Sequence, residues 1–173
     1  VYNKPSASDL VKFPLVLNKY LFPFFAFLKA RKLHKKNKYN AIWSIMANYA
    51  GFAALFFKLR YSRVPFLLTL QEGDPIEYIK KRVRFVYILF KRIFTRADFI
   101  QAISNYLADF GKNMGFSGPI EVIPNGVDFK LFSEKISNEI LSELKTQLGK
   151  KYGEKFIITT SRLVIKNGVG DLI

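Results

Sequence analysis

The amino-acid sequence predicts an α/β fold in which helices flank a parallel, Rossmann-like sheet. Continuous apolar runs such as 64–70 alternate with longer segments of helical spacing, and strands that are covered on both faces of a parallel sheet have this continuous character. Polar turn residues follow the apolar runs, at the carboxyl ends of the expected strands, where open α/β sheets bind their ligands. The 173 residues suffice for one such domain and a short extension.

The first part of the chain is expected to supply helices and two strands. Apolar residues at helical spacing over about 9–38 predict one or two helices, with two internal prolines at their ends or kinks. The runs 39–46 and 64–70 predict strands, and 51–60 predicts the helix between them. A helix between parallel strands provides the usual right-handed crossover.

A long basic helix and a third strand are expected next. The segment 76–95 has helical spacing, and seven Lys or Arg lie between Lys80 and Arg96, next to the bulky apolar residues 85–90. A charged helix face is usually only solvated, but the apolar neighbours also permit contact with a membrane surface. The run 97–103 predicts a buried strand.

Capping residues mark the following helix. Ser104 ends the third strand and caps a helix over 106–114, and Gly115 is a natural helix stop. The short run 120–123 predicts a fourth strand, which leads directly into the Pro-Asn-Gly turn at 124–128.

The remainder of the chain is expected to leave this first domain. A polar helix over 137–155 has few apolar positions, as in a connector, and 156–160 predicts a new strand. We therefore divide the chain into a domain over 1–136, a connecting helix over 137–155, and the start of a second domain over 156–173. One strand and part of a turn cannot bury a core, so we expect this second domain to be incomplete here.

Composition limits the chemistry. The chain has no cysteine, which excludes disulfides and thiolate metal sites, and His34 is its single histidine. We expect His34 to be a surface residue in a solvated basic tail, because no acidic residue stands nearby to orient its ring. The formal charge is +15, from 28 Lys and Arg against 13 Asp and Glu, and such a protein is attracted to nucleic acid, anionic lipid or phosphorylated ligands.

The sequence contains neither a recognisable membrane span nor a recognisable signal peptide. No stretch reaches the roughly 20 uninterrupted apolar residues of a membrane span, and the first residues resemble neither a signal peptide nor a mature start. We expect the chain to begin inside a longer one, without the first strand of its domain. The lack of cysteine fits a reducing, cytoplasmic compartment, and the basic aromatic segment leaves room for peripheral attachment to the inner face of the cell membrane.

Two loops that follow expected strands contain charged residues that could bind a ligand. Arg162 and Lys166 lie in the loop between the last expected strand and a glycine-rich helix start, where two cations and free helix N–H groups can bind a diphosphate; an ordinary basic loop is the alternative. Glu72 and Asp74 lie on a strand-end turn, which could place one carboxylate in a cleft, although acidic turns are commonly structural.

A basic module that binds nucleic acid is the other functional class that the charge allows. The sequence contains no GxGxxG or P-loop motif, and no helix-turn-helix, KH loop or RNP-like strand, while its aromatic residues lie mainly in apolar runs typical of a core. We therefore expect no nucleic-acid partner. A non-catalytic scaffold or fragment is the third alternative.

Three ordered motifs bear a family resemblance. The sequence over 123–128 reads IPNGVD, that over 160–169 reads TSRLVIKNGV, and the strand-to-helix step over 97–107 precedes both. Together they resemble the corresponding motifs of family 4 glycosyltransferases, and the resemblance covers the chain from Tyr39 onward. An isolated Pro-Asn-Gly turn would carry no such information.

The resemblance implies a GT-B enzyme with two Rossmann-like domains, of which the first holds the acceptor and the second the nucleotide sugar. It implies a retaining transfer that needs no metal or other cofactor, from a nucleotide sugar to a glycan or lipid-linked acceptor. Arg162 and Lys166 match the cations that neutralise the leaving diphosphate.

The remaining candidate site residues lie in these motifs and at the ends of the expected strands. They are Asn125, Gly126 and Gly168 on the donor or cleft loops, and Gln71, Glu72 and Ser104 on the acceptor side of the cleft.

The sequence departs from the family pattern in three places. Asn167 occupies the position where many relatives have the Lys, and Gln71 stands where many have a His, so Gln71 can position a ligand but cannot take up a proton. The E-x7-E segment of the second domain is absent, which leaves the catalytic residues unassigned. We expect these 173 residues alone to transfer no sugar, because positioning and electrostatic stabilisation need a cleft closed from two sides.

Overall fold

The computed structural model describes residues 13–164 and 167–172. Contacts divide the chain into two compact units, a first unit that ends at Asn125 and a second unit that begins at Gly126. The domain boundaries expected after residues 136 and 155 stay a prediction.

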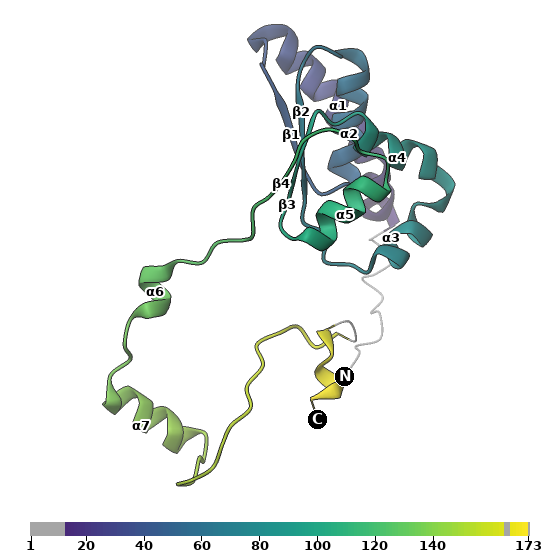
Figure 1. Cartoon of the computed structure of the whole chain (residues 1–173). Coiled ribbons are helices and arrows are strands. Elements are labelled where there is room, and N and C mark those ends of the chain that lie inside the picture. The colour runs from purple at the N-terminus through teal and green to yellow at the C-terminus, as the bar shows by residue number, and fades with distance from the viewer. Residues whose placement is uncertain (1–12, 165–166, 173) are drawn as a thin grey trace. The chain divides into compact units, whose positions relative to one another are not determined.

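A four-stranded parallel sheet forms the centre of the first unit, and it confirms the predicted fold class. Its strands lie in sequence order, within the four runs that predicted strands (Figure 1). They are β1 (Ile42–Ile45), β2 (Phe66–Leu70), β3 (Phe99–Ala102) and β4 (Ile120–Val122). Sequential parallel order requires a crossover between each pair of neighbours, and the helices provide it.

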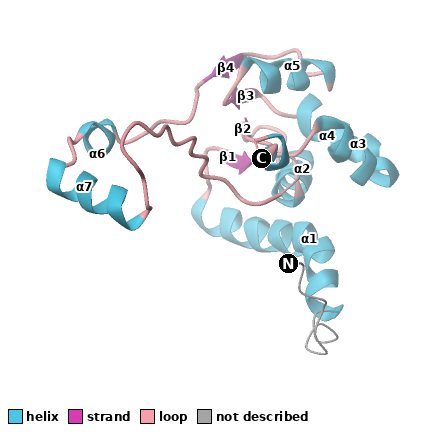
Figure 2. Ribbon diagram, turned by 90° about the horizontal axis from the view of Figure 1, so that it is seen from below, coloured by secondary structure: helices cyan, strands magenta, loops and turns pink. Residues whose placement is uncertain are grey.

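Helices α2, α4 and α5 follow the first three strands and contribute to the core, while α1 packs against α2 (Figures 1 and 2). The helices of this unit are α1 (Phe13–Asn37), α2 (Tyr49–Arg60), α3 (Ile76–Arg82), the short 3-10 helix η2 (Arg84–Val86), α4 (Tyr87–Thr95) and α5 (Asn105–Asn113). None of the described helices combines the length and apolarity of a membrane span.

Glycines permit the closest helix contacts. A Cβ atom on Gly111 of α5 would lie 3.2 Å from Leu70 Cδ1 and 3.3 Å from Ile100 Cδ1, both in the sheet. A Cβ on Gly51 of α2 would lie 3.2 Å from two side-chain carbons of Ile93 in α4. Larger residues at either position would push the helix away from the core.

The sheet is less evenly covered than the continuous apolar runs suggested. Leu68, Leu70 and Ile100 are fully buried on the face that α2 and α5 cover. On alternate positions of β1, however, Trp43 is 65% exposed and Ile45 is 47% exposed. Side chains in a strand alternate between faces, so the other face of the sheet is partly open in this unit.

The long helix expected over 76–95 is interrupted. It forms α3 and α4, with Val83 ending α3 and η2 between them. Helix α4 buries Phe90, Ile93 and Phe94 at helical spacing, whereas α3 has no buried residue. Only the second half is therefore held against the core. In contrast, the first segment forms a single helix, α1, with Pro23 inside it.

The prediction that His34 is a solvated surface residue is wrong. Its ring centroid lies 4.5 Å from that of Tyr61 and 5.2 Å from that of Phe57, because the end of α1 packs on the end of α2. Its basic neighbours Lys35 and Lys36 are exposed, as expected.

The second unit contains three short helices in its described part. They are α6 (Phe129–Ser133), α7 (Asn138–Gln147) and the 3-10 helix η4 (Val169–Asp171). Helix α7 forms the first part of the expected connector and is capped by the Ser137 side chain. The strand expected over 156–160 is not formed, and Ile157 and Ile158 are 82% and 75% exposed. A strand requires a neighbour to satisfy its backbone groups, and the described residues provide none there.

Candidate functional site

The carboxyl edge of the sheet brings together residues that are far apart in the sequence. Gln71 follows β2, Ser104 follows β3 and Asn125 follows β4. Backbone hydrogen bonds continue the pairing past the strand ends, from Ile103 N to the Leu70 carbonyl at 3.2 Å and from Ile123 N to the Ala102 carbonyl at 2.8 Å.

Two of the candidate residues touch directly. The Gln71 side chain donates through Nε2 to Asn125 Oδ1 at 2.8 Å. The contact spans 54 positions of sequence and connects the loop after β2 to the loop after β4. Both amides keep further donor and acceptor capacity, so the pair can still bind hydroxyl groups.

Ser104 has a structural task at the same edge. Its hydroxyl oxygen accepts a hydrogen bond from Leu107 N at 3.3 Å, which caps α5. This confirms the predicted capping role. A contact between Ser104 and an acceptor stays a prediction.

Glu72 turns inward from the edge. Its Oε1 atom accepts a hydrogen bond from Ala47 N at 2.6 Å, and its Oε2 atom is buried without a hydrogen-bond partner among the described residues. Burial raises the pKa of Glu72, and the hydrogen bond from Ala47 only partly offsets this. A buried oxygen with unused hydrogen-bonding capacity is expensive unless a ligand or water satisfies it.

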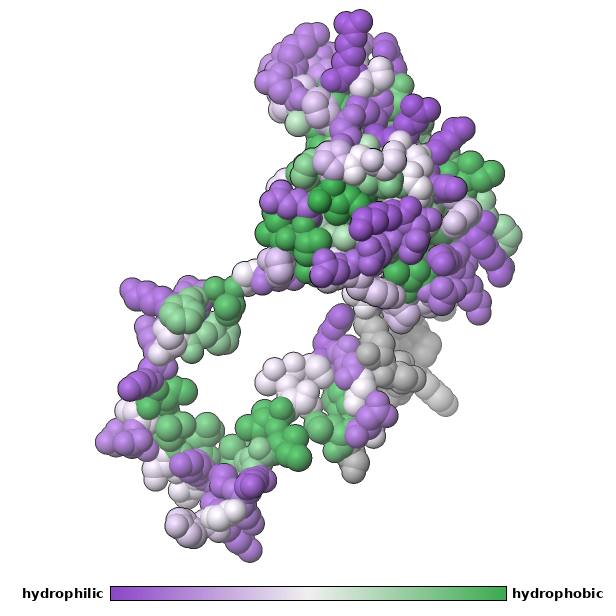
Figure 3. Space-filling model, in the orientation of Figure 1, coloured by the Kyte–Doolittle hydropathy of each residue, from purple (hydrophilic) through white to green (hydrophobic). Residues whose placement is uncertain are grey.

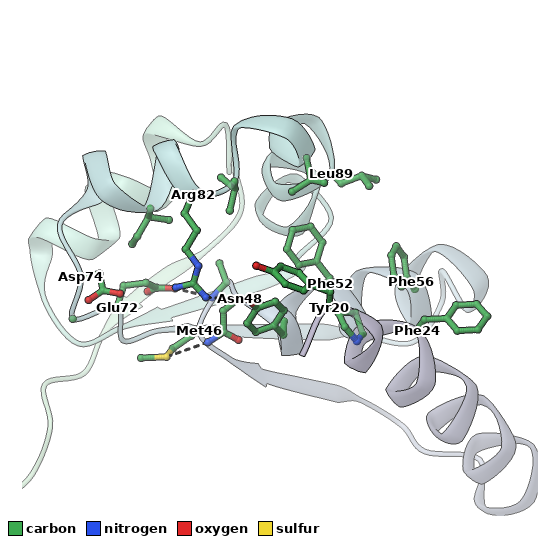
Figure 4. A pocket seen from close by; sticks show the side chains of 17 residues that line it. Tyr20, Phe24, Met46, Asn48, Phe52, Phe56, Glu72, Asp74, Arg82 and Leu89 are labelled. Carbon is green, nitrogen blue, oxygen red and sulfur yellow. Dashed lines mark hydrogen bonds between the residues drawn. The ribbon is translucent and has the colours of Figure 1, made fainter. Parts of the chain in front are cut away.

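Glu72 lies in the wall of a cavity of about 480 Å³ between the carboxyl ends of β1 and β2 and the helices α1 to α4 (Figure 4). Sites for small molecules commonly have volumes of about 300–1,000 Å³. The lining residues are Tyr20, Pro23, Phe24, Met46, Ala47, Asn48, Tyr49, Phe52, Phe56, Glu72, Gly73, Asp74, Ile79, Arg82, Val83, Val86 and Leu89.

One end of this cavity is polar. The Arg82 side chain extends from α3 toward Glu72 and Asn48 (Figure 4). Its Nη2 atom donates to the Tyr49 hydroxyl at 3.3 Å, and its guanidinium lies 5.5 Å from the centre of the Tyr49 ring. The hydrogen bond to Tyr49 and the nearby Asp74 carboxylate raise the pKa of Arg82, so this residue is cationic at any physiological pH.

The other end of the cavity is aromatic and aliphatic. Phe24 from α1, Phe52 and Phe56 from α2, and Leu89 from α4 line it (Figure 4). Phe24 is 53% exposed, so the apolar end opens to the surface beside α1.

Met46 shapes the polar end through its backbone. It follows β1 with a φ of 67°, in the left-handed region that residues with a side chain rarely adopt. Met46 N donates to the Thr69 carbonyl at 2.7 Å, which continues the sheet, and the next residues turn into α2, where the Asn48 side chain caps the helix. The turn directs the Ala47 N–H at Glu72.

Sequence reasoning missed most of this cavity and, of the residues that line it, named only Glu72 and Asp74. Asn48 lies in the turn between β1 and α2, at the carboxyl end of a strand, so the rule on strand ends could have identified it. The sequence indicated Arg82 only as one of seven cations on a helix face that was expected to be solvated. Nothing in the sequence signalled that Tyr20 and Phe24 would meet α2, because that contact depends on how α1 packs.

The candidate donor residues belong to the second unit. Arg162 is exposed, and its carbonyl oxygen accepts hydrogen bonds from Val164 N at 2.8 Å and from the Asn167 side chain at 2.9 Å. Asn167 therefore closes the loop that carries Arg162. Gly168 has a φ of 64° directly before η4, a conformation that favours glycine. Lys166 lies outside the described residues.

Neither Gly126 nor a metal-binding group adds a packing or ligand constraint to the described residues. Gly126 begins the second unit, and a Cβ atom added to it would meet nothing within 4 Å, so packing does not require a glycine there. Among the described residues, no three His, Asp or Glu side chains gather in a group that could hold a metal ion.

Comparison with known proteins identifies the first unit. No curated protein matches the sequence closely enough to count as a relative. The sequence profile of Glycosyltransferase Family 4 matches residues 5–131, which span the parallel sheet, its polar carboxyl edge and the cavity. On this match over most of its length, and with the parallel α/β fold that agrees with it, the chain belongs to glycosyltransferase family 4.

Proposed function

We propose that this protein transfers a sugar from a nucleotide-sugar donor to a glycan or lipid-linked acceptor, with retention of the anomeric configuration and without a metal ion. The observation that supports this most is the family match over residues 5–131. That range contains the polar carboxyl edge where parallel α/β sheets bind ligands.

In this proposal the first unit binds the acceptor. The Gln71 and Asn125 amides can donate to and accept from sugar hydroxyls at the edge. Glu72 and Arg82 offer a carboxyl and a guanidinium in the adjacent cavity. None of these groups has to change its charge during transfer, so their role is to position the acceptor.

The second unit would bind the donor diphosphate. The Arg162 guanidinium can form two parallel hydrogen bonds to phosphate oxygens, and the Lys166 ammonium can add a second positive charge. Such cations stabilise the negative charge that develops on the leaving diphosphate. The hydrogen bonds of Asn167 and Val164 to the Arg162 carbonyl support this role, because they restrain the loop.

We also propose that the first unit docks on an anionic membrane surface. Around α3, η2 and α4 the apolar side chains of Tyr78, Phe85 and Ile88 are 55%, 86% and 74% exposed. Cations lie among them, and the Arg84 guanidinium lies 4.5 Å from the centre of the Phe85 ring. On the face seen in Figure 3, hydrophobic and hydrophilic side chains intermingle over this unit. Each Lys or Arg near an anionic surface can contribute about 1 kcal/mol.

A transfer assay tests the enzymatic proposal. The natural polypeptide that carries this sequence is incubated with individual nucleotide sugars, a mixed glycan and lipid-extract acceptor and a metal chelator, and the product anomer is determined by NMR. We expect one donor to give product with the anomeric configuration of that donor. Lack of transfer from every nucleotide sugar, or an inverted product, would contradict the proposal.

The 173-residue chain is the matched comparison in that assay. We expect it to give no product alone, because the E-x7-E segment does not occur in the sequence and transfer requires a cleft closed from two sides. Turnover by the 173-residue chain alone would overturn this second expectation and leave the first intact.

A further inference from the structure

The cavity of the first unit has a polar end and an apolar end, which lie against different parts of the fold. The polar end lies at the carboxyl edge of the sheet, beside Glu72 and the turn that follows β1. The apolar end runs between α1, α2 and α4 and opens where Phe24 is exposed. A ligand that fills both ends must therefore be amphiphilic, with its polar group toward the sheet.

The charges at the polar end select the kind of polar group. Glu72, Asp74 and Arg82 are the charged residues in the cavity wall, so a single guanidinium faces two carboxyl groups. Arg82 already donates to the Tyr49 hydroxyl and interacts with Asp74. A phosphate or other anion would gain little attraction there and would meet carboxyl oxygens at close range. A neutral polyol can both donate to these oxygens and accept from the guanidinium.

The unused oxygen of Glu72 provides the specific contact. Oε1 is occupied by Ala47 N, and Oε2 is buried in the cavity wall without a hydrogen-bond partner among the described residues. A hydroxyl group can satisfy Oε2 in either protonation state of the carboxyl group, by donating to the carboxylate or by accepting from the acid. An apolar or anionic group could not do so in the ionised state.

We propose that this cavity binds a neutral glycolipid acceptor, with a sugar hydroxyl on Glu72 Oε2 and the apolar chain along Phe24, Phe56 and Leu89. The inference rests on the proposed function and narrows its acceptor to a lipid whose head group has no phosphate next to the sugar. The apolar end opens beside the exposed Phe24 side chain of α1, so the rest of a long apolar chain can extend out of the cavity.

Binding to the 173-residue chain tests the inference without any transfer step. The probes are octyl β-glucoside below its micelle concentration, methyl β-glucoside as the head alone, and octyl phosphate as an anionic head on the same chain. We expect octyl β-glucoside to bind at least about tenfold more tightly than methyl β-glucoside, because the octyl chain leaves water. Equal affinity of the two glucosides would overturn the inference.

Two neighbouring phenylalanines provide a matched control. Phe24 and Phe25 are 53% and 59% exposed on the same helix, but only Phe24 lines the cavity. We expect Phe24→Ala to weaken octyl β-glucoside binding by about tenfold and Phe25→Ala to leave it unchanged. Equal effects of both variants would show adsorption on the surface of α1 and would overturn the inference.

Octyl phosphate distinguishes binding in the cavity from binding to the basic surface of the protein. We expect its binding to weaken with salt and to be unaffected by Phe24→Ala, since the whole chain has a formal charge of +15 and Arg82 is the one Lys or Arg among the described residues of the cavity wall. We further expect Glu72→Gln to improve octyl phosphate binding relative to octyl β-glucoside. Salt-resistant octyl phosphate binding that depends on Phe24 would overturn the preference for a neutral head.

The outcomes distinguish the two proposals. If the glucoside probes fail these tests while the natural polypeptide transfers sugar to a soluble glycan, the cavity inference is wrong and the proposed function stands. If octyl β-glucoside binds as expected but no nucleotide sugar is used, the proposed function is wrong.

Discussion

The side chains of Gln71 and Asn125 are joined by a hydrogen bond of 2.8 Å between Nε2 and Oδ1, across the carboxyl edge of the sheet. Strand β3 lies between the two strands that these residues follow. The contact therefore fixes two loops to each other at the edge where ligands of α/β sheets bind.

This hydrogen bond should appear as coupling in a double-mutant cycle. We predict that Gln71→Ala and Asn125→Ala together destabilise the chain by about 0.5–1 kcal/mol less than the sum of the single changes, because either one breaks the same bond. The free energy of unfolding is measured in urea through the fluorescence of Trp43, the single tryptophan. Gln71→Ala combined with the remote Asn113→Ala should be additive, and additivity in both cycles would contradict the contact.

The buried carboxyl of Glu72 should make stability depend on pH. Because burial raises its pKa, the folded protein holds this proton more tightly than the unfolded chain does. Its contribution to stability is therefore fully present below the unfolded pKa and is lost as the pH rises through the folded pKa.

We predict that Glu72→Gln gains stability relative to the unmodified chain as the pH rises from about 4 to about 7, because the amide cannot ionise. Glu77→Gln is the control, since the Glu77 side chain is 88% exposed. Urea unfolding at each pH measures the difference. The prediction would be refuted if the stability of Glu72→Gln relative to the unmodified chain stayed constant with pH or fell toward neutral pH.

Lys58 anchors the opposite edge of the sheet. Its Nζ atom lies 2.7 Å from Asp98 Oδ2 and donates to the carbonyls of Ser62 and Val64 at 2.7 Å and 3.0 Å. We predict that Lys58→Met lowers the free energy of unfolding by about 2–4 kcal/mol, because it leaves these acceptors without their partner.

A second ion pair provides the control for Lys58. Lys112 and Asp109 form a surface pair at 3.1 Å, with side chains 61% and 65% exposed. Lys112→Met should change stability by less than about 0.5 kcal/mol. Similar losses of unfolding free energy in Lys58→Met and Lys112→Met would contradict the prediction that the more buried pair contributes more.

Membrane docking should depend on charge and on exposed aromatic side chains. We predict that the chain sediments with anionic vesicles, that it does so less at higher salt, and that Phe85→Ser weakens binding by about tenfold. Phe129→Ser is the control, because Phe129 is 78% exposed but lies in the second unit, whereas Phe85 is 86% exposed in the first. Equal binding to neutral and anionic vesicles would eliminate the docking proposal.

Local sequence signals predicted the first unit well. The runs 64–70 and 97–103 form neighbouring parallel strands, and Ser104 caps the helix that follows. Gly115 ends that helix with a φ of 90°. These features depend on short stretches of chain, such as apolar runs, capping hydroxyls and positive φ, so a single sequence contains them.

Features that depend on packing could not be predicted. The side chain of His34 is shielded because α1 packs against Phe57 and Tyr61 at the end of α2. The expected helix over 76–95 breaks at Val83 because only its second half, α4, packs against the core. The run 156–160 has the composition of a strand, but the described residues provide no neighbouring strand for it. The cavity combines residues of α1, α2, α3 and α4, and no motif in the sequence connects these helices.

The role of Arg162 provides the most direct test of the account. In the natural polypeptide, kcat/KM for the nucleotide sugar is compared between Arg162→Ala and Lys151→Ala, two exposed cations of the second unit. If Arg162 stabilises the departing diphosphate, its loss should lower kcat/KM by about 100-fold or more and leave octyl β-glucoside binding unchanged, while Lys151→Ala should have no effect. Full transfer activity in Arg162→Ala would contradict the account.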